Sequence, residues 1–263
     1  MKSKLRAWAV AAILMAAAAA PVQAITFFDS KLADPFKAGQ KCTTNEIGSM
    51  GSYVYDYPSK YDGVYSPWID GPFIWTCPAS GFVTFGSEFN DIPADQKAKI
   101  AAWLEANPAD IKTLGEEQLH DRMEAIYAAR GMPDDFWAYF YRVRAHYAHT
   151  AEKGDAYRAK ALPLLKARLN DAKVAPADRA QALFLVGYYS RRLGDPSGAA
   201  KAFAAIGDID WSKARENRKG TAEYFGELIK DVQAGKLDGQ CGQVNDAPSS
   251  CPLARQGAAE TAH

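Results

Sequence analysis

The sequence has no excess of charge of either sign, because its 263 residues include 31 lysines and arginines and 31 aspartates and glutamates. Proteins that hold nucleic acid or anionic lipid by broad electrostatic attraction carry a strongly basic surface. A balanced composition argues against that mode of binding. We therefore expect no nucleic-acid partner.

The sequence also lacks the short motifs of the common enzyme classes. It contains no G-x-S-x-G motif, no P-loop and no G-x-G-x-x-G stretch after a strand pattern. Its cysteines are not spaced as C-x-x-C, which argues against thioredoxin-type chemistry. We predict no catalytic residue, no cofactor and no metal site. A hydrolase built from scattered residues is compatible with these absences, but no motif supports it.

Beyond its first residues, the sequence has no apolar run near the roughly 20 residues that a membrane-spanning helix needs. Residues 1–24 combine basic Lys2, Lys4 and Arg6 with an apolar stretch and a small-residue site that ends at Ala24. That order is typical of a cleaved signal peptide. We therefore expect a bacterial protein that is periplasmic or secreted, with no membrane span after cleavage.

Cysteine is scarce, with four residues in the expected mature chain: Cys42, Cys77, Cys241 and Cys251. An even number in an exported protein favours disulfides, and four cysteines allow three pairings. We favour Cys42–Cys77 and Cys241–Cys251, because each pair lies within one segment and closes a short loop. Closing such a loop stabilises a fold by about 2–4 kcal/mol.

Residues 25–91 are rich in aromatic residues that glycine and proline interrupt. Alternation at 52–57 and short apolar runs at 73–77 and 82–85 predict three strands of a small antiparallel sheet. Residues 25–40 show no regular period, and we expect them to lie extended against this unit.

Two interpretations of these aromatic residues remain open. Tyr53, Tyr55, Tyr57, Trp68 and Trp75, with carboxylates nearby, are able to stack on the sugar rings of cell-wall glycan if they are exposed. Alternatively, the aromatic residues form the core of a small sheet, because a small unit must bury what apolar area it has. We favour the core interpretation.

Residues 92–233 carry helical patterns almost throughout, and residues 234–263 form a tail with few large apolar residues. Apolar stripes predict helices at 96–106, 116–130, 136–150, 157–169 and 211–233. We expect a turn at 152–155 to join the third of these helices to the fourth.

The clearest helical pair spans residues 180–206 and folds about a turn at 193–196. Small residues at Gly187 and Ala199 allow the two helix backbones to approach, and Phe203 fills the space between them. This spacing resembles a tetratricopeptide repeat. The predicted fold class is mainly α: a tetratricopeptide-like stack of helical hairpins with a small N-terminal antiparallel β unit.

Four stretches of the N-terminal half carry a further likeness: Lys41-Cys42, Tyr53-Val54-Tyr55-Asp56-Tyr57-Pro58, Tyr61-Asp62 and Trp75-Thr76-Cys77-Pro78-Ala79-Ser80-Gly81-Phe82. They resemble a bacterial family of unknown function that has two cysteine knuckles followed by tetratricopeptide-like helices. In that family each knuckle is a C-x-x-C pair, as in a zinc ribbon, whereas this chain has Asn45 and Ser80 at the second positions. Structural zinc requires four cysteine or histidine ligands. The resemblance therefore implies that a Cys42–Cys77 disulfide replaces the metal.

Histidine offers only weak candidates for chemistry. His146 and His149 are three positions apart on a predicted helix, and His120 lies one turn before Glu124. No matching pair on another helix completes a metal site, so we interpret these residues as packing and surface contacts.

The predicted function is that of a binding scaffold, which holds a partner protein or peptide on a helical-repeat surface in the periplasm. Arg142, Arg144, Arg191 and Arg192 lie on or beside first helices of the predicted hairpins. Their guanidinium groups offer donors for acidic groups of the partner.

The alternative function is that of a glycan-binding protein or a hydrolase that acts on the cell wall through the aromatic unit. Two carboxylates such as Asp56 and Asp62, facing one cleft roughly 5–10 Å apart, would support the hydrolase.

Overall fold

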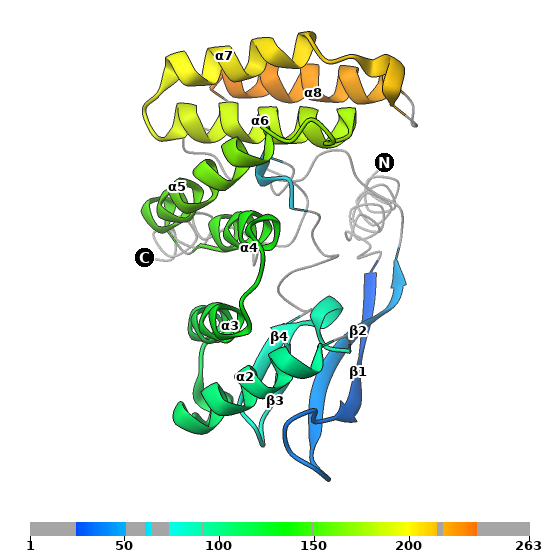
Figure 1. Cartoon of the computed structure of the whole chain (residues 1–263), viewed down its shortest axis with the longest axis vertical. Helices are drawn as coiled ribbons and strands as arrows, with labels where there is room; N and C mark the ends of the chain where they lie inside the picture. Colours follow the sequence, from blue (N-terminus) through cyan, green and yellow to red (C-terminus); the bar gives the residue numbers. More distant parts are fainter. Residues whose placement is uncertain are drawn as a thin grey trace, which may run out of the picture.

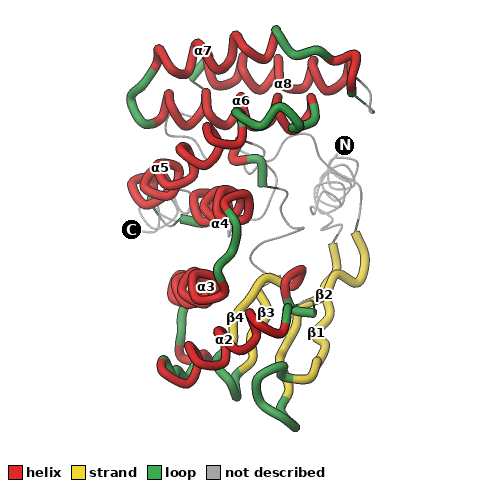
Figure 2. Tube along the Cα trace, in the orientation of Figure 1, coloured by secondary structure: helices red, strands yellow, loops and turns green. Residues whose placement is uncertain are grey.

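The computed structural model describes residues 25–50, 61–64, 74–90, 92–148, 150–214 and 218–235. In this part of the chain helices predominate, and a small antiparallel sheet lies at one end of the helical column (Figures 1 and 2). The prediction of a mainly α fold with a small N-terminal β unit is confirmed. The predicted signal peptide, the strand at 52–57 and the Cys241–Cys251 disulfide lie outside the described residues.

The sheet has the strand order β1 (Ile25–Ala33), β2 (Lys41–Met50), β3 (Ile74–Cys77) and β4 (Phe82–Phe85). Each strand is antiparallel to its neighbour. The strands predicted at 73–77 and 82–85 are confirmed, whereas β1 and β2 were not predicted as strands. Neither of their sequences alternates apolar with polar residues, so their strand structure depends on their long pairing with each other.

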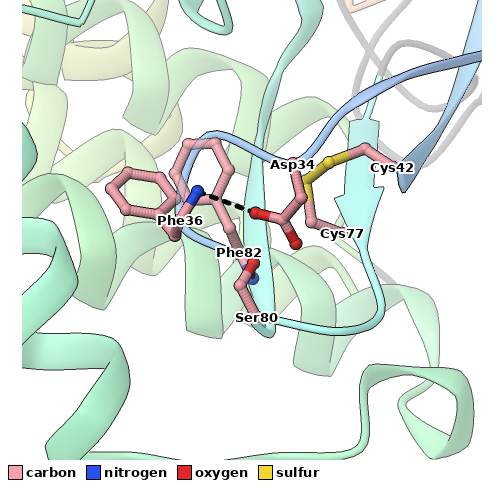
Figure 3. Close-up of a disulfide and its surroundings, with 6 residues drawn as sticks. All are labelled: Asp34, Phe36, Cys42, Cys77, Ser80 and Phe82. Atoms are coloured by element: carbon pink, nitrogen blue, oxygen red, sulfur yellow. Dashed lines mark hydrogen bonds between the residues drawn. A yellow bond between two sulfur atoms is a disulfide. The ribbon is translucent and has the colours of Figure 1, made fainter. Parts of the chain in front are cut away.

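The predicted Cys42–Cys77 disulfide is confirmed, and it joins facing residues of neighbouring strands (Figure 3). Thr43 of β2 lies opposite Thr76 of β3, so the antiparallel register places Cys42 opposite Cys77. Both cysteines are buried in the same apolar cluster as Phe82. The disulfide therefore ties the β1–β2 pair to the β3–β4 hairpin.

The helices of the described residues follow the sheet. They are α2 (Ala94–Ala106), α3 (Glu116–Arg130), α4 (Asp134–His146), α5 (Ala151–Arg168), α6 (Pro176–Arg192), α7 (Pro196–Gly207) and α8 (Arg218–Gln233). Short 3₁₀ turns are η3 (Gly86–Glu88), η4 (Ile111–Thr113) and η5 (Trp211–Lys213). The helix predicted at 211–233 thus begins only at Arg218, after the separate turn η5.

Local signals explain most helix ends. Gly131 follows α3 with φ of 80°, in the left-handed region that favours glycine. Asp195 caps α7, because its carboxylate accepts a hydrogen bond from the Gly198 amide at 2.8 Å. The predicted turn between α6 and α7 is present where the sequence places it.

The turn predicted at 152–155 is wrong, because these residues form the first turn of α5. The chain reverses between the end of α4 at His146 and the start of α5 at Ala151, and the Thr150 hydroxyl caps α5 by accepting from the Lys153 amide at 3.2 Å. Gly154 has a different role, since a Cβ atom there would lie 3.0 Å from the carbonyl oxygen of Ala145 on α4. This glycine permits a close approach of two helices.

Two apolar clusters hold the fold together. The first joins the sheet to α2, α3 and α4 and includes Phe85, Ile100 and Met123. The second lies among α5, α6, α7 and α8. Helix α4 contributes Phe140 to the first cluster and Ala138 to the second. The boundary expected between residues 91 and 92 therefore falls inside a core that the sheet shares with three helices.

The predicted packing of α6 on α7 is present in atomic detail. Gly187 and Ala199 lie on facing helices, and the Phe203 ring packs directly on the Gly187 backbone. A Cβ atom on Gly187 would lie 2.4 Å from Cε1 of Phe203. Helices α4 and α5 also pack along each other, so two helical hairpins adjoin in the column (Figure 1).

We expect Tyr127→Phe to lower the free energy of unfolding by about 1–2 kcal/mol, measured by urea denaturation. The buried Tyr127 hydroxyl on α3 accepts a hydrogen bond from the Phe85 amide on β4 at 2.9 Å and lies 3.0 Å from the Thr84 hydroxyl. Phenylalanine leaves that amide without its acceptor. Thr84→Val is the matched control with a smaller expected loss, because the amide keeps its partner. Equal losses in the two variants would contradict this account.

Candidate functional site

A short segment of the N-terminal half, residues 61–64, is enclosed by the helices. All four of its residues are buried, and Asp62 is only 3% exposed. In Figure 1 this segment is the short cyan trace beside α5 and α6. We call it the inserted segment, and its contacts define the candidate site.

The carboxylate of Asp62 is held by Arg158 of α5 through two hydrogen bonds. Nε donates to Oδ1 at 2.9 Å, and Nη2 donates to Oδ2 at 2.7 Å. Arg158 is itself buried, and its guanidinium lies over the rings of Tyr188 and Tyr189 of α6. This is the bidentate geometry in which arginine binds a carboxylate most strongly.

The backbone of the inserted segment is held by Arg142 of α4. Its Nε donates to the carbonyl oxygen of Asp62 at 2.9 Å, and its Nη2 donates to that of Gly63. Gly63 has φ of 61°, and a Cβ atom there would lie 2.8 Å from Nε2 of Gln181. Tyr61 completes the contacts by donating a hydrogen bond to Asp231 of α8 at 3.0 Å. Helices far apart in the sequence therefore bind one tetrapeptide.

A second carboxylate extends the ion-pair network. Asp155 accepts a hydrogen bond from Arg158 at 2.9 Å, and from Arg192 at 2.7 and 3.0 Å. Arg192 closes α6, whereas Asp155 and Arg158 lie in the first two turns of α5. The network thus links the inserted segment to both neighbouring hairpins.

The site remains charged at neutral pH. Burial by itself raises the pKa of the Asp62 carboxyl, but the charge and hydrogen bonds of Arg158 outweigh burial and hold that pKa below its ordinary value. Burial lowers the pKa of Arg158, and the charge of Asp62 more than compensates, so that pKa is raised. The pKa of the nearby His146 is lowered, chiefly by burial. The arrangement is therefore an ion pair beside a neutral imidazole.

The arginines predicted to face a partner are turned toward the protein itself. Arg142 and Arg144 are buried, and Arg144 pairs with Asp121 at 2.6 Å and contacts Tyr157. Arg192 is bound to Asp155, as described above, and Arg191 is half-buried and also has an interaction within the chain. The expectation of an open arginine face is therefore corrected for Arg142, Arg144 and Arg192, because these guanidinium groups bond to carboxylates or carbonyl oxygens of the chain itself.

Sequence reasoning missed Arg158, which makes the strongest contact of the site. Its partner lies 96 residues away, and no spacing rule connects positions so distant. Asp62 was noted in a family likeness and as a carboxylate of the alternative hydrolase, and neither interpretation pointed to an arginine partner. An aspartate within an aromatic, glycine-containing segment was the one available signal of burial.

Of the five aromatic residues proposed to stack on glycan, the structure describes Trp75, and this residue gives the glycan interpretation no support. Trp75 is 9% exposed and packs edge-on against Phe89, with ring centroids 5.3 Å apart. Tyr53, Tyr55, Tyr57 and Trp68 lie outside the described residues, as does Asp56. Asp62 faces Arg158 in the interior and not an open cleft.

Of the other histidine candidates, His120 contributes to packing. His120 is buried, with Nδ1 3.1 Å from the Glu116 carbonyl oxygen and its ring stacked on Tyr147. His149 lies outside the described residues. A small cavity bordered by His120 and Arg144 has about 10 Å³ of accessible space, which suffices for roughly one water molecule.

Comparisons with protein-family models, with curated proteins and with solved structures find no match to this chain. None of the helices within the described ranges is long and apolar enough to cross a membrane. The fold and the site define a mainly α-helical protein whose helical hairpins enclose a segment of their own chain.

Proposed function

We propose that this chain is a binding scaffold that holds a protein or peptide partner in an oxidising compartment, the periplasm or the cell exterior. The observation that carries the proposal is the recognition of residues 61–64 by the helices. One arginine binds the carboxylate, a second binds main-chain carbonyls, and apolar residues surround both. These are contacts by which a binding site recognises a short acidic peptide.

The buried disulfide supports the compartment, because disulfides persist where the environment is oxidising. Residues 1–24, with the pattern of a signal peptide, agree with export. The partner segment that fits best adopts a turn, as residues 61–64 do, and places an aspartate before a glycine, since Gly63 has a positive φ and leaves no room for a side chain. Such a segment competes with the inserted segment for Arg142 and Arg158.

The test uses a fluorescent peptide with the sequence of residues 58–67, Pro-Ser-Lys-Tyr-Asp-Gly-Val-Tyr-Ser-Pro. The wild-type chain should bind this peptide weakly, because a tethered segment competes at an effective concentration on the order of millimolar. Asp62→Asn removes the ion pair between the inserted segment and Arg158, so the inserted segment competes less well while its side chain keeps the same shape. We expect this variant to bind the peptide at least about tenfold more tightly by fluorescence anisotropy, a gain of about 1.4 kcal/mol.

Two controls accompany this test. A peptide with asparagine in place of its aspartate should not gain affinity, and Asp134→Asn, a change at an exposed position of α4, should behave as the wild type. Circular dichroism establishes that each variant is folded. A folded Asp62→Asn variant that binds both peptides equally, or neither, would refute recognition by this site.

A further inference from the structure

A buried carboxylate lies beside the disulfide, away from the inserted segment. Asp34 follows β1 and is 7% exposed (Figure 3). Its Oδ1 accepts a hydrogen bond from the Phe36 amide at 2.9 Å. Its Oδ2 is buried and has no hydrogen-bond partner among the described residues. A buried carboxylate oxygen without a partner is costly and points to an absent proton or cation.

The carboxylate oxygen of Asp34 and the sulfur atoms of Cys42 and Cys77 all lie within 4.8 Å of one another. Once the S–S bond is broken and the sulfur atoms have moved to the roughly 3.5–4 Å that separates two thiolates on one zinc ion, two sulfur ligands and one oxygen ligand are able to contact a single metal ion. In the disulfide the sulfur atoms are not ligands, because metals bind the thiolate form. The site is therefore complete only after the disulfide has been reduced.

The backbone holds the three groups in place independently of the disulfide. Cys42 and Cys77 face each other on paired strands, and β2 is also paired with β1 along its whole length. The Asp34 amide donates to the Gln40 carbonyl oxygen at 2.9 Å, which fixes the turn between β1 and β2. Reduction breaks one covalent bond and leaves these hydrogen bonds intact.

We propose that the reduced chain binds a thiophilic divalent cation, of the class of Zn²⁺, through Asp34, Cys42 and Cys77. A dithiol reductant supplies two electrons and two protons, the S–S bond breaks, two thiols form, and the reductant becomes a disulfide. The cation then displaces the two thiol protons to solvent. A fourth position remains open to water, as in zinc sites with three protein ligands.

This ligand set differs from a zinc ribbon with four cysteines. Ser80 stands where the family has the second cysteine of the second knuckle, and its hydroxyl accepts a hydrogen bond from the Phe82 amide at 3.3 Å. The group that lies beside the two sulfur atoms is instead the carboxylate of Asp34. The rings of Phe36 and Phe82, with centroids 4.7 Å apart, lie beside the site (Figure 3). Their apolar surfaces limit the access of water, which strengthens attraction between the cation and its anionic ligands.

The experiment uses the full chain with Cys241→Ser and Cys251→Ser, so that only Cys42 and Cys77 supply thiols. The protein is reduced anaerobically with a phosphine, which is oxidised to its phosphine oxide, and is then titrated with Co²⁺. We expect thiolate-to-cobalt charge-transfer absorption that saturates at one equivalent and is abolished by Zn²⁺. The oxidised protein should show none of this absorption.

Asp34→Asn, which keeps the shape and removes the charge, should weaken Co²⁺ binding at least about tenfold, or about 1.4 kcal/mol. Asp29→Asn, at an exposed position of β1, is the matched control and should bind as the parent. If reduction unfolds the chain, Zn²⁺ should restore the helical circular dichroism of the parent and not of Asp34→Asn. Failure of the reduced parent to bind, or equal binding by Asp34→Asn, would overturn the proposal.

Discussion

Arg158→Leu should lower the free energy of unfolding by about 3–5 kcal/mol, because it leaves the Asp62 carboxylate buried without its partner. Both side chains of this pair lie in the interior, and their two hydrogen bonds measure 2.9 and 2.7 Å. The double variant Asp62→Asn with Arg158→Leu should recover part of the loss, since no unpaired charge remains. Urea denaturation of the wild type, the two single variants and the double variant measures the coupling energy between the two side chains.

The same pair sets an expected dependence on pH. In the wild type the pKa of Asp62 is lower when folded than the ordinary value of about 4, so its stabilisation is complete above pH ~4 and lost as the pH falls through the lowered pKa. In Arg158→Leu the main influence that lowers this pKa is gone, and burial, which raises it, outweighs the smaller effects of His146 and Tyr189. The stability gap between the two proteins should therefore be widest near neutral pH and should narrow in acid.

The control for both measurements is Lys230→Gln on α8, which removes the partner of the exposed Glu227 with the same loss of one positive charge. We expect no measurable change in stability, since exposed ion pairs contribute little. A loss from Arg158→Leu no larger than that of the control, or a gap independent of pH, would show that the buried pair does not stabilise the inserted segment.

Gly187→Ala should destabilise the protein by about 3 kcal/mol, at the upper end of the range for overpacked cores. The added methyl carbon would lie 2.4 Å from Cε1 and 2.6 Å from Cδ1 of Phe203. The Phe203 ring lies 6.1 Å from the ring of Phe184, centroid to centroid, in a cluster that also includes Phe225 of α8, and this packing restricts its movement. Thermal and urea denaturation both measure the loss.

Gly226→Ala on α8 is the matched control, because nothing lies within 4 Å of the added carbon. In a helix interior this change should stabilise by about 0.5–1 kcal/mol. Phe203→Leu combined with Gly187→Ala should recover part of the loss by removing the ring. If Gly187→Ala is as stable as the wild type, α6 and α7 are not in the close contact that the fold requires.

Elements with local signals could be predicted from the sequence. The bounds of α3 follow from an apolar stripe that ends at Gly131, and the turn between α6 and α7 follows from Gly194 and the cap Asp195. The packing of Gly187 on Phe203 could also be predicted, because a spacing of sixteen residues across a hairpin is still a short-range pattern.

Elements that depend on distant partners could not be predicted. β1 and β2 are strands because they pair with each other, and their residues have no alternation that marks a strand. Glycine both favours turns and permits two backbones to approach closely, and the sequence pattern alone led to the turn interpretation of Gly154. Only the position of α4 shows that this glycine permits close approach. For the same reason the burial of Arg142 and Arg144 could not be read from their place on a helix.

The sequence by itself determined the class of the fold, the hairpin of α6 and α7, and one disulfide. Each of these is encoded within a short stretch or by the scarcity of cysteine. Only the tertiary structure decided which charges meet in the interior, as Asp62 meets Arg158. The physical reason is that a buried charge is tolerated only beside its partner, and that partner is chosen by the three-dimensional packing rather than by separation along the chain.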